Sequence, residues 1–237
     1  MRIPSIASWA ICLCFVVQAR ASLVSAFTTD SEGWTAASSD SSVTGDYTLS
    51  YFYTNTQIYQ PTGGNPGGYI GFISDPDTYT TYYLAPVAYL GDQSASYGGS
   101  IAYDGQDLPT GSDTVFTDVA DIVLQSGSIL LLSRDGWSQS AWTHESLALV
   151  PSNFQVGSLS GPTATEAQLQ EVLGNLTSLR ICGEDQDGPD SSGLDNVVLT
   201  YAPEPAVTCA GIGLVLTLMT KRRLHSFKGS EKSQESN

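Results

Sequence analysis

The sequence predicts an all-β domain, an antiparallel β-sandwich with one short helix. Two observations support this fold class. Many short stretches are rich in tyrosine, threonine and branched aliphatic residues, and turn residues separate them. Helices do not alternate with these stretches, as they would in a parallel α/β sheet, so a pair of packed sheets is expected.

Each strand prediction rests on composition and on the turns beside it. A segment dense in glycine and proline, residues 61–68, indicates a turn, and Gln125–Ser128 between two apolar runs indicates a hairpin. Cys182, the one cysteine between the two terminal segments, is expected as a buried strand residue. The predicted strands are residues 46–53, 69–73, 81–84, 100–103, 118–124, 129–133, 143–149, 178–182 and 196–201.

One helix is predicted after Pro162. Thr163 and Glu166 have the spacing of a capping box, and Gly174 suits the end of the helix. The apolar residues recur at i, i+3, i+4 and i+7, so they share one face that is expected to pack on the sandwich. These apolar residues are Leu169, Val172, Leu173 and Leu176.

The N-terminus has the pattern of a secretory signal, predicted over residues 1–26. Arg2 precedes an apolar run, Ile6–Val17, and small residues follow it. Cleavage is expected after Ala21 or Ala26. A retained anchor helix is the alternative, but the run is short for that role.

Charge restricts the partners of the domain. Between Ser22 and Pro205 there are 22 acidic residues, and the only basic ones are Arg134 and Arg180, which gives a balance of −20. Such a surface repels phosphate backbones, so no nucleic-acid partner is expected. Anionic lipid headgroups are disfavoured for the same reason.

A short apolar segment lies near the C-terminus between a Pro-Glu-Pro motif and a basic cluster. As a helix, Ala206–Thr220 would rise roughly 22 Å, which is less than the ~30 Å hydrocarbon core of a bilayer. The basic cluster should stay on the cytoplasmic side, leaving the acidic domain outside. The residues of the two motifs are Pro203, Glu204, Pro205, Lys221, Arg222 and Arg223.

This pattern, residues 203–223, resembles the PEP-CTERM sorting signal of Gram-negative and related bacteria. The resemblance implies processing by an exosortase-type transpeptidase, membrane association through the segment, and a protein that is secreted or held at the cell envelope. The family's signal usually ends close to its arginines, whereas residues 224–237 follow here as a polar tail that is expected to be disordered. An ordinary C-terminal anchor is the alternative.

Three blocks in the middle of the chain carry a second resemblance. They are Phe27 with Gly33-Trp34, then Pro66–Ile70 with Tyr83–Pro86 and Tyr89–Gly99, and then Ala164–Ile181 with Leu194–Leu199. In order and spacing, residues 27–202 resemble the laminin IV type A (laminin B) domain, which is extracellular in laminins and perlecan. The resemblance implies a jelly-roll sandwich akin to galactose-binding and carbohydrate-binding modules, without enzymatic activity.

Calcium is the expected cofactor, if the domain has one. Hard cations prefer several oxygen ligands, and Glu184 belongs to an acidic stretch that offers them. Modules of the type that the resemblance implies often hold a structural calcium with an acidic residue of the last strand, which Asp195 would supply, with Asp30 or Glu32 completing the site. The candidate ligands are therefore Asp195, Glu184 and Asp30. A solvated acidic loop is the alternative.

Catalysis has weak support in the sequence. His144 is the only histidine in the domain, and no G-x-S-x-G motif is present. Paired carboxylates could hydrolyse glycosides, but with so many acids a close pair carries little information. Tyrosines could instead bind glycans, although on strands they more often pack half-buried. The candidate tyrosines are Tyr51, Tyr53, Tyr59, Tyr79, Tyr82 and Tyr83.

The sequence therefore predicts a non-enzymatic structural or interaction protein outside the cytoplasm. Its expected partner is polysaccharide or another matrix or surface component. The alternative function is that of a secreted polysaccharide-active hydrolase that uses paired carboxylates, and a passive spacer without a ligand is a third possibility.

Overall fold

The computed structural model describes residues 21–39, 47–53, 58–75, 80–109, 119–134, 141–184 and 190–202. The chain divides into two compact units, Met1–Pro203 and Glu204–Asn237, and the described residues all belong to the first. Most of the predicted signal, the segment 203–223 and the tail 224–237 lie outside the described residues. Within the described ranges, no helix is both long and apolar enough to cross a bilayer.

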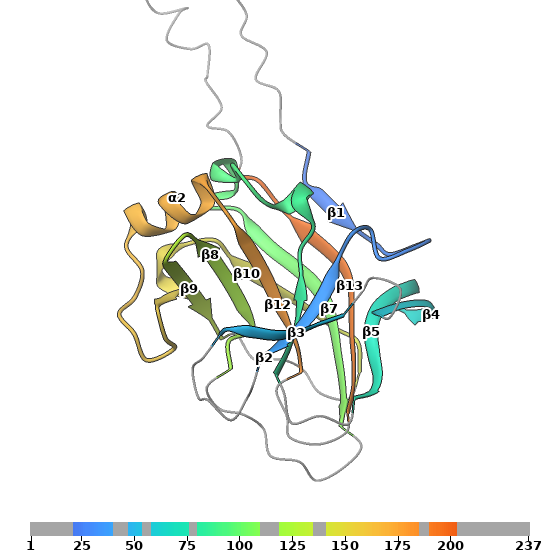
Figure 1. Ribbon diagram of the computed structural model, residues 1–237. Helices are drawn as coiled ribbons and strands as arrows, with labels where there is room; N and C mark the ends of the chain where they lie inside the picture. The colour runs from blue at the N-terminus through green and yellow to red at the C-terminus, as the bar shows by residue number, and fades with distance from the viewer. Residues whose placement is uncertain are drawn as a thin grey trace, which may run out of the picture. The chain divides into compact units, whose positions relative to one another are not determined.

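Two antiparallel sheets pack face to face (Figure 1), which confirms the predicted sandwich. One sheet contains β1 (Leu23–Ser25), β4 (Tyr59–Gly64), β5 (Gly67–Asp75), β7 (Ser100–Pro109), β10 (Thr143–Ala148) and β13 (Asp190–Leu199). The other contains β2 (Thr35–Ser39), β3 (Leu49–Tyr53), β6 (Thr80–Leu84), β8 (Ile122–Ser126), β9 (Ile129–Ser133), β11 (Gln155–Val156) and β12 (Ser178–Glu184). Short 3₁₀ turns lie at Val87–Tyr89, Ser94–Ser96 and Pro151–Asn153.

The strand order shows which elements are central. In the six-stranded sheet the order is β10-β7-β13-β5-β4, and β1 also pairs with β13. In the seven-stranded sheet the order is β11-β9-β8-β12-β6-β2-β3. Strands β13 and β12 therefore lie near the middle of their sheets, and residues on them have neighbours on both sides.

The core forms between the inner faces of the two sheets. Along β12, Leu179 and Ile181 point inward, and along β13, Leu194 and Val197 do the same; all four are buried in one apolar cluster. Alternate residues of a strand point to opposite faces, so the residues between them face outward. The residues of the two central strands that face outward are therefore the ones that can contribute to a binding site on each sheet.

A cluster of aromatic rings joins the N-terminal residues to this core. Trp34 packs edge-on against Phe27 and Tyr89, with ring centroids 6.2 and 5.3 Å apart. The hydroxyl of Ser25 accepts a hydrogen bond from Trp34 Nε1 at 3.0 Å and another from the Tyr89 hydroxyl at 3.1 Å. These bonds satisfy polar groups that burial would otherwise leave unpaired.

This cluster corrects the predicted start of the domain at residue 27. Leu23–Ser25 pairs with β13, and the Ser25 side chain is buried among the aromatic rings. A cut after Ala26 would remove this strand, whereas a cut after Ala21 would keep it. The folded domain thus begins before the predicted boundary, and of the two predicted cleavage positions only the one after Ala21 preserves it.

The single α-helix in the described ranges, α2 (Glu166–Gly174), closes one end of the sandwich (Figure 1). Its capping box uses Thr165 and Gln168, because Thr165 Oγ1 accepts from the Gln168 N–H and Gln168 Oε1 accepts from the Thr165 N–H. The predicted box of Thr163 and Glu166 was wrong by two residues, since residue 163 still forms a β-bridge. The predicted apolar face is confirmed for Leu169, Val172 and Leu173, which are buried, whereas Leu176 is buried beyond the end of the helix, in a β-bridge with Gly91.

The outer face of the seven-stranded sheet carries a second apolar cluster. Tyr82, Val123, Leu132 and Cys182 are buried in it. The expectation of a buried thiol at Cys182 is confirmed. The expectation that Tyr82 could bind a glycan is wrong for the same reason, because its ring is covered.

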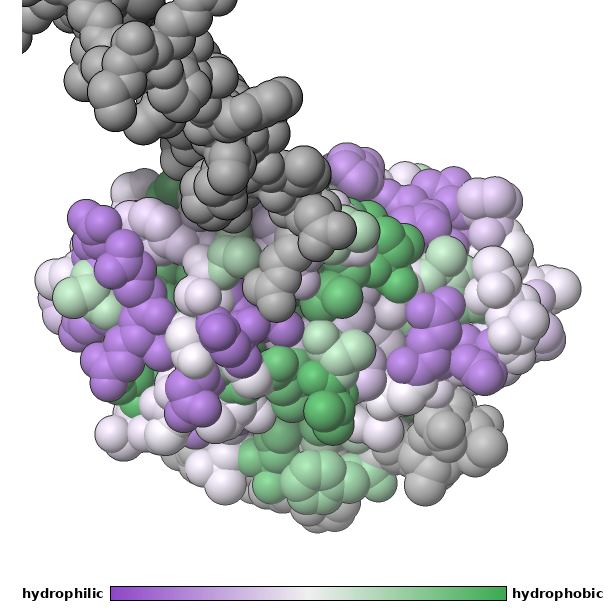
Figure 2. All heavy atoms as spheres, turned by 90° about the horizontal axis from the view of Figure 1, so that it is seen from above, coloured by the Kyte–Doolittle hydropathy of each residue, from purple (hydrophilic) through white to green (hydrophobic). Residues whose placement is uncertain are grey.

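The end of the domain beside α2 and β1 presents a mosaic of polar side chains and apolar patches (Figure 2). Among the large hydrophobic residues, Val24, Phe52 and Val87 are exposed. They belong to β1, β3 and a 3₁₀ turn, so these three side chains are spread over separate elements.

Truncating Leu194 to alanine should reduce the free energy of unfolding by about 2–5 kcal/mol, because it removes buried methyl groups and leaves a cavity in the core. Chemical denaturation measures the change. Val87→Ala is the matched control: this side chain is 84% exposed, so the variant should stay within about 0.5 kcal/mol of the parent. Equal stability losses in the two variants would contradict the assigned core.

Candidate functional site

The outer face of the six-stranded sheet brings aromatic and polar side chains together. Because Leu194 points into the core, Gly193 and Asp195 face outward on β13. Asp195 pairs with Asp104 of β7, which pairs with His144 of β10, so the three residues lie in one row across the sheet. We call this surface the Trp142 face; it comprises Tyr69, Asp104, Trp142, His144 and Asp195.

Two rings form the apolar part of the Trp142 face. Tyr69 and Trp142 meet edge-to-face, with ring centroids 5.3 Å apart and an interplanar angle of 82°. Trp142 Nε1 donates a hydrogen bond to the carbonyl oxygen of Gly63 at 3.0 Å, which fixes the orientation of the indole. Both side chains are partly exposed, so they offer ring surface to a ligand.

Glycines allow the two rings to meet above the sheet. Gly193 pairs with Gly71 of β5 and with Gln106 of β7. A Cβ added at Gly193 would lie 2.7 Å from the Trp142 ring and 3.0 Å from the Tyr69 ring. The absence of a side chain at this position therefore creates the space that the aromatic pair occupies.

Asp104 is the centre of the polar row. His144 Nδ1 lies 2.7 Å from Asp104 Oδ1, with the two side chains 65% and 10% exposed respectively. Asp104 Oδ2 accepts hydrogen bonds from the side-chain amides of Asn65 at 3.2 Å and Asn196 at 2.8 Å. The carboxylate is held in place by these donors, while the imidazole remains open to solvent.

Asp195, the third residue of this row, is buried. Its Oδ2 accepts the backbone N–H of Asn65, and its Oδ1 accepts the backbone N–H of Asn196, both at 2.7 Å. Burial raises the pKa of this carboxyl above its usual value of 3.8, and the neighbouring charges of Asp104 and Glu32 act in the same direction, whereas the two backbone hydrogen bonds oppose it.

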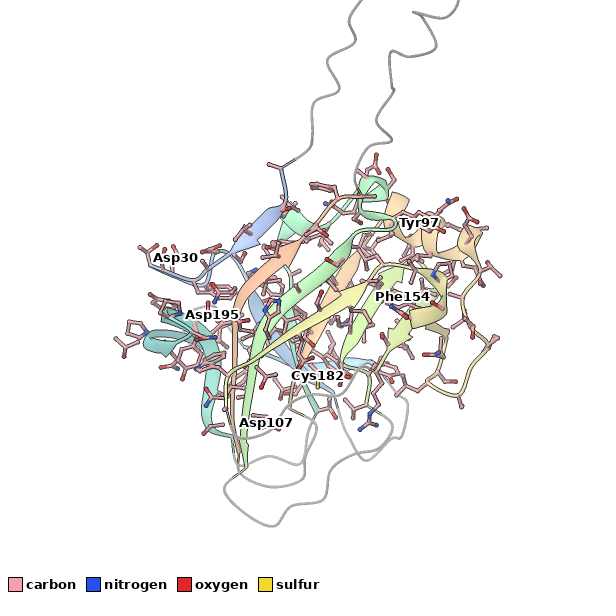
Figure 3. All side chains as sticks on the ribbon, turned by 180° about the vertical axis from the view of Figure 1, so that it is seen from behind. Asp30, Tyr97, Asp107, Phe154, Cys182 and Asp195 are labelled. Carbon is pink, nitrogen blue, oxygen red and sulfur yellow. The ribbon has the colours of Figure 1, made fainter. Side chains whose placement is uncertain are left out.

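The loop after β1 supplies two more acidic residues. Glu32 Oε1 accepts the backbone N–H groups of Ala26 and Phe27 at 3.1 and 2.8 Å. Asp30 Oδ1 accepts the N–H of Glu32 at 2.7 Å, and Asp30 is exposed on this loop while Asp195 is buried within the sheet (Figure 3). Both carboxylates thus shape the loop by binding its backbone.

Of the three candidate calcium ligands, the structure describes the side chains of Asp30 and Asp195, whereas only the backbone of Glu184 is described. Glu184 pairs with Thr81 at one end of the seven-stranded sheet. Asp195 lies in the opposite sheet, on β13. It is five residues, or roughly 16 Å, from Asp190, where β13 starts. In the described ranges, no group of three or more histidine, cysteine, aspartate or glutamate residues has the arrangement to hold a metal ion. The Asp195 oxygens face N–H donors instead of oxygen ligands, and calcium binding stays a prediction.

The arrangement is better suited to binding than to hydrolysis. All four carboxylate oxygens of Asp104 and Asp195 accept hydrogen bonds from the protein. Within the part of the chain that the structure describes, His144 bonds only to Asp104, so no hydroxyl or thiol nucleophile is coupled to its ring. A neutral or protonated imidazole at this exposed position can still donate a hydrogen bond to a ligand.

The tyrosines proposed from the sequence do not form this site. Tyr83, like Tyr82, is buried, with its hydroxyl bonded to Ser192 at 2.8 Å, and Tyr59 is half-buried against the core. For Tyr51, Tyr53 and Tyr79 the side chains lie outside the described residues. The sorting residues Pro203, Glu204, Pro205, Lys221, Arg222 and Arg223 lie outside them as well.

Sequence reasoning missed Tyr69, Trp142, Asp104 and the two asparagines. One signal for this site was present in the sequence, namely the glycines at positions 71 and 193. A glycine inside a strand often indicates that other groups lie close to the backbone at that position. Strand alternation also puts Trp142 and His144 on one face. These residues meet, however, only because of the order of the strands in the sheet. Local sequence pattern does not predict that order.

The raised pKa of Asp195 predicts a pH dependence of stability. Between 3.8 and the folded pKa the folded state binds more protons than the unfolded state, so this group's contribution is present below pH 3.8 and lost as pH rises through the folded pKa. Asp195→Asn removes that titration. The stability advantage of the parent over this variant, measured by urea denaturation across this pH range, should shrink as pH rises. An advantage that grows with pH would contradict the assignment, and Glu171→Gln on the exposed side of α2 controls for net charge.

Known proteins share parts of this sequence and fold. The chain matches the family Laminin B (Domain IV) over residues 82–210, which is more than half of its length. It is 29% identical over 138 residues to laminin subunit alpha-3 of Homo sapiens, a match that covers 55% of this chain and 4% of that protein. The chain thus spans only a small part of the laminin that it matches.

Two solved structures resemble the fold. The L4b domain of human laminin alpha-2 gives a TM-score of 0.43 at 11% identity, covering 52% of this chain and 70% of that one. The family 11 carbohydrate-binding module of a cellulosomal cellulase of Clostridium thermocellum gives 0.46 at 14% identity, covering 80% and 99%. The matched segment 82–210 contains Asp104, Trp142, His144 and Asp195 of the Trp142 face, and on the strength of that match the chain belongs to the Laminin B (Domain IV) family.

Proposed function

We propose that this protein is a non-enzymatic domain, secreted or exposed at the cell surface, that binds polysaccharide or another matrix component through the Trp142 face. The observation that carries the proposal is the aromatic pair of Tyr69 and Trp142 beside the polar row of Asp104 and His144. Aromatic surface next to a few fixed polar groups is the composition of most small-molecule binding sites.

The chemistry of a sugar matches both halves of this surface. Its C–H groups can lie on the partly exposed rings, and its hydroxyls can bond to the exposed imidazole of His144, which Asp104 holds in place. Asp104, Asp195 and Glu32 make the surroundings acidic. A neutral sugar polymer therefore fits this face better than a polyanion does.

Family membership supports a role outside the cell. The matched relative is a laminin subunit, and the matched segment is a laminin domain. Because the chain corresponds to so little of that protein, the activities and partners of a whole laminin are not transferred to it. What supports the proposal is the domain type together with the geometry of the Trp142 face.

Hydrolysis of the same polysaccharides is the competing function. The carboxylates of Asp104 and Asp195 are already occupied by internal donors, which is a poor arrangement for a general acid or a nucleophile. Incubating the full chain with polysaccharides and measuring reducing ends separates the two functions. If reducing ends are released and the Asp104→Asn substitution abolishes their release, the proposed function changes from binding to hydrolysis.

Anchoring and processing are a separate proposal. Residues 203–223 would hold the protein in the membrane, at least transiently, before an exosortase-type enzyme acts on it. Calcium binding likewise remains a proposal that chelation followed by a melting curve can test. Intact mass and fractionation of the native protein test anchoring and processing, because a chain that keeps its C-terminus in the soluble fraction contradicts both.

Trp142→Ala should weaken retention in affinity gels that contain a bound polysaccharide by at least about tenfold, because tryptophan at the centre of a binding surface commonly contributes more than 1.4 kcal/mol. Phe52→Ala is the matched control, since Phe52 is a 70% exposed ring on β3 of the other sheet. Melting curves check that both variants are folded. Retention that Phe52→Ala lowers and Trp142→Ala leaves intact would refute the assigned face.

A further inference from the structure

Arg180 lies on the other sheet, far in sequence from the residues of the Trp142 face. Its neighbours Leu179 and Ile181 point into the core, so the Arg180 side chain lies on the outer face of the seven-stranded sheet. The residue is only 7% exposed. It is one of two basic residues in a region with a balance of −20, and it is the one that this sheet buries.

The guanidinium is held by neutral acceptors. One terminal nitrogen donates to the carbonyl oxygen of Tyr47 at 2.7 Å, and the other donates to Gln125 Oε1 at 2.6 Å. Nε donates to the hydroxyl of Ser178 at 3.1 Å. In the described ranges no carboxylate forms an ion pair with Arg180, and burial lowers the pKa of its guanidinium below the usual value for arginine. A buried positive charge with neutral partners only is costly.

A pocket opens beside this charge. Its volume is about 450 Å³, within the range of sites that hold small molecules. A guanidinium carries five N–H groups, and the three bonds above use one from each nitrogen. Among the described residues, each terminal nitrogen therefore keeps one N–H without an acceptor, and a ligand could reach these groups from the pocket that Arg180 lines. The lining residues are Tyr47, Thr48, Leu49, Gln125, Ser128, Leu130 and Arg180.

From this geometry we infer that the Arg180 pocket binds a carboxylate carried on a sugar ring, a uronate. The two remaining N–H groups suit a carboxylate in the paired arrangement that arginine favours. The hydroxyl of Ser128 and the amide of Gln125 can meet sugar hydroxyls, and Leu49 and Leu130 can cover the apolar edge of a ring. This site does not depend on the Trp142 face.

The charge of the domain limits the ligand further. An acidic surface repels densely charged anions, so a sulfated or phosphorylated polymer is disfavoured as a whole. A single carboxylate flanked by neutral hydroxyls meets one buried cation and little repulsion. An anion is therefore expected to bind this acidic domain at the pocket, where Arg180 supplies the opposite charge.

Sodium glucuronate, glucose and sodium acetate are the probes, titrated into the isotope-labelled full chain. Two-dimensional NMR should show saturable shifts of the Arg180 Nε–H and Gln125 side-chain amide signals with glucuronate. Glucose and acetate should bind at least about tenfold more weakly, because glucose lacks the carboxylate and acetate lacks the sugar ring. Equal binding of glucose or of acetate would overturn the inference, and so would unchanged Arg180 signals.

Variants separate binding from folding. Ser128→Glu adds a negative charge at the exposed rim without altering the Arg180 bonds, and it should weaken glucuronate binding severalfold. Ser94→Glu adds the same charge at an exposed position on a 3₁₀ turn and should leave binding unchanged. Arg180→Lys keeps the charge but loses the paired donors, so it should bind at least about tenfold more weakly. Glucuronate binding that survives both Ser128→Glu and Arg180→Lys would place the ligand elsewhere.

Discussion

The pleat of β13 is the constraint on which both the core and the Trp142 face depend. This strand pairs with β1, β5 and β7, so it fixes the position of most of the six-stranded sheet. Leu194, Val197 and Leu199 face the core, while Gly193 and Asp195 face outward. A one-residue shift of β13 would exchange these two sets, placing a carboxylate in the apolar core and turning leucine side chains to the outer face.

A local irregularity in β13 completes the arrangement. The register shifts between Asp195 and Val198, and Asn196 has a φ of 50°, a conformation that asparagine tolerates better than most residues. This conformation lets the backbone N–H of Asn196 bind Asp195 while its side-chain amide binds Asp104. The bulge therefore holds two neighbouring carboxylates that would otherwise repel each other.

Charge distinguishes the two outer faces. The six-stranded sheet carries carboxylates next to aromatic rings, and the seven-stranded sheet carries a buried arginine that lines a pocket with leucine residues. We propose neutral, hydroxyl-rich ligands for the first face and an isolated anion for the second. A polysaccharide that contains both neutral and uronate sugars would have complementary chemistry for each.

Much of the fold could be predicted because strand composition and helix periodicity are local signals. The stretches at 129–133 and 143–149 and the apolar face of α2 are examples. Strands β1 and β11 were missed because two or three residues carry no pattern, and β4 was missed because glycine and proline indicated only a turn. The capping box was misplaced because Thr163 and Thr165 both precede an acceptor by three residues.

The Trp142 face was less predictable. Its residues come from β5, β7, β10, β13 and the position just before β10, so they meet only through strand order and register, neither of which a single sequence specifies. Glu184 and Asp195 are close in the sequence, yet their strands, β12 and β13, belong to opposite sheets. Nearness along the chain therefore does not show that these two residues share a site.

The most direct measurement of the central claim is the indole N–H signal of Trp142 during titration with the polysaccharide fragment that binds best. This N–H donates to Gly63, so a ligand on the Trp142 face must change its environment. The account predicts a saturable shift of this signal together with the amides of Gly193 and Asp195. Binding that moves other signals and leaves the Trp142 indole unchanged would contradict it.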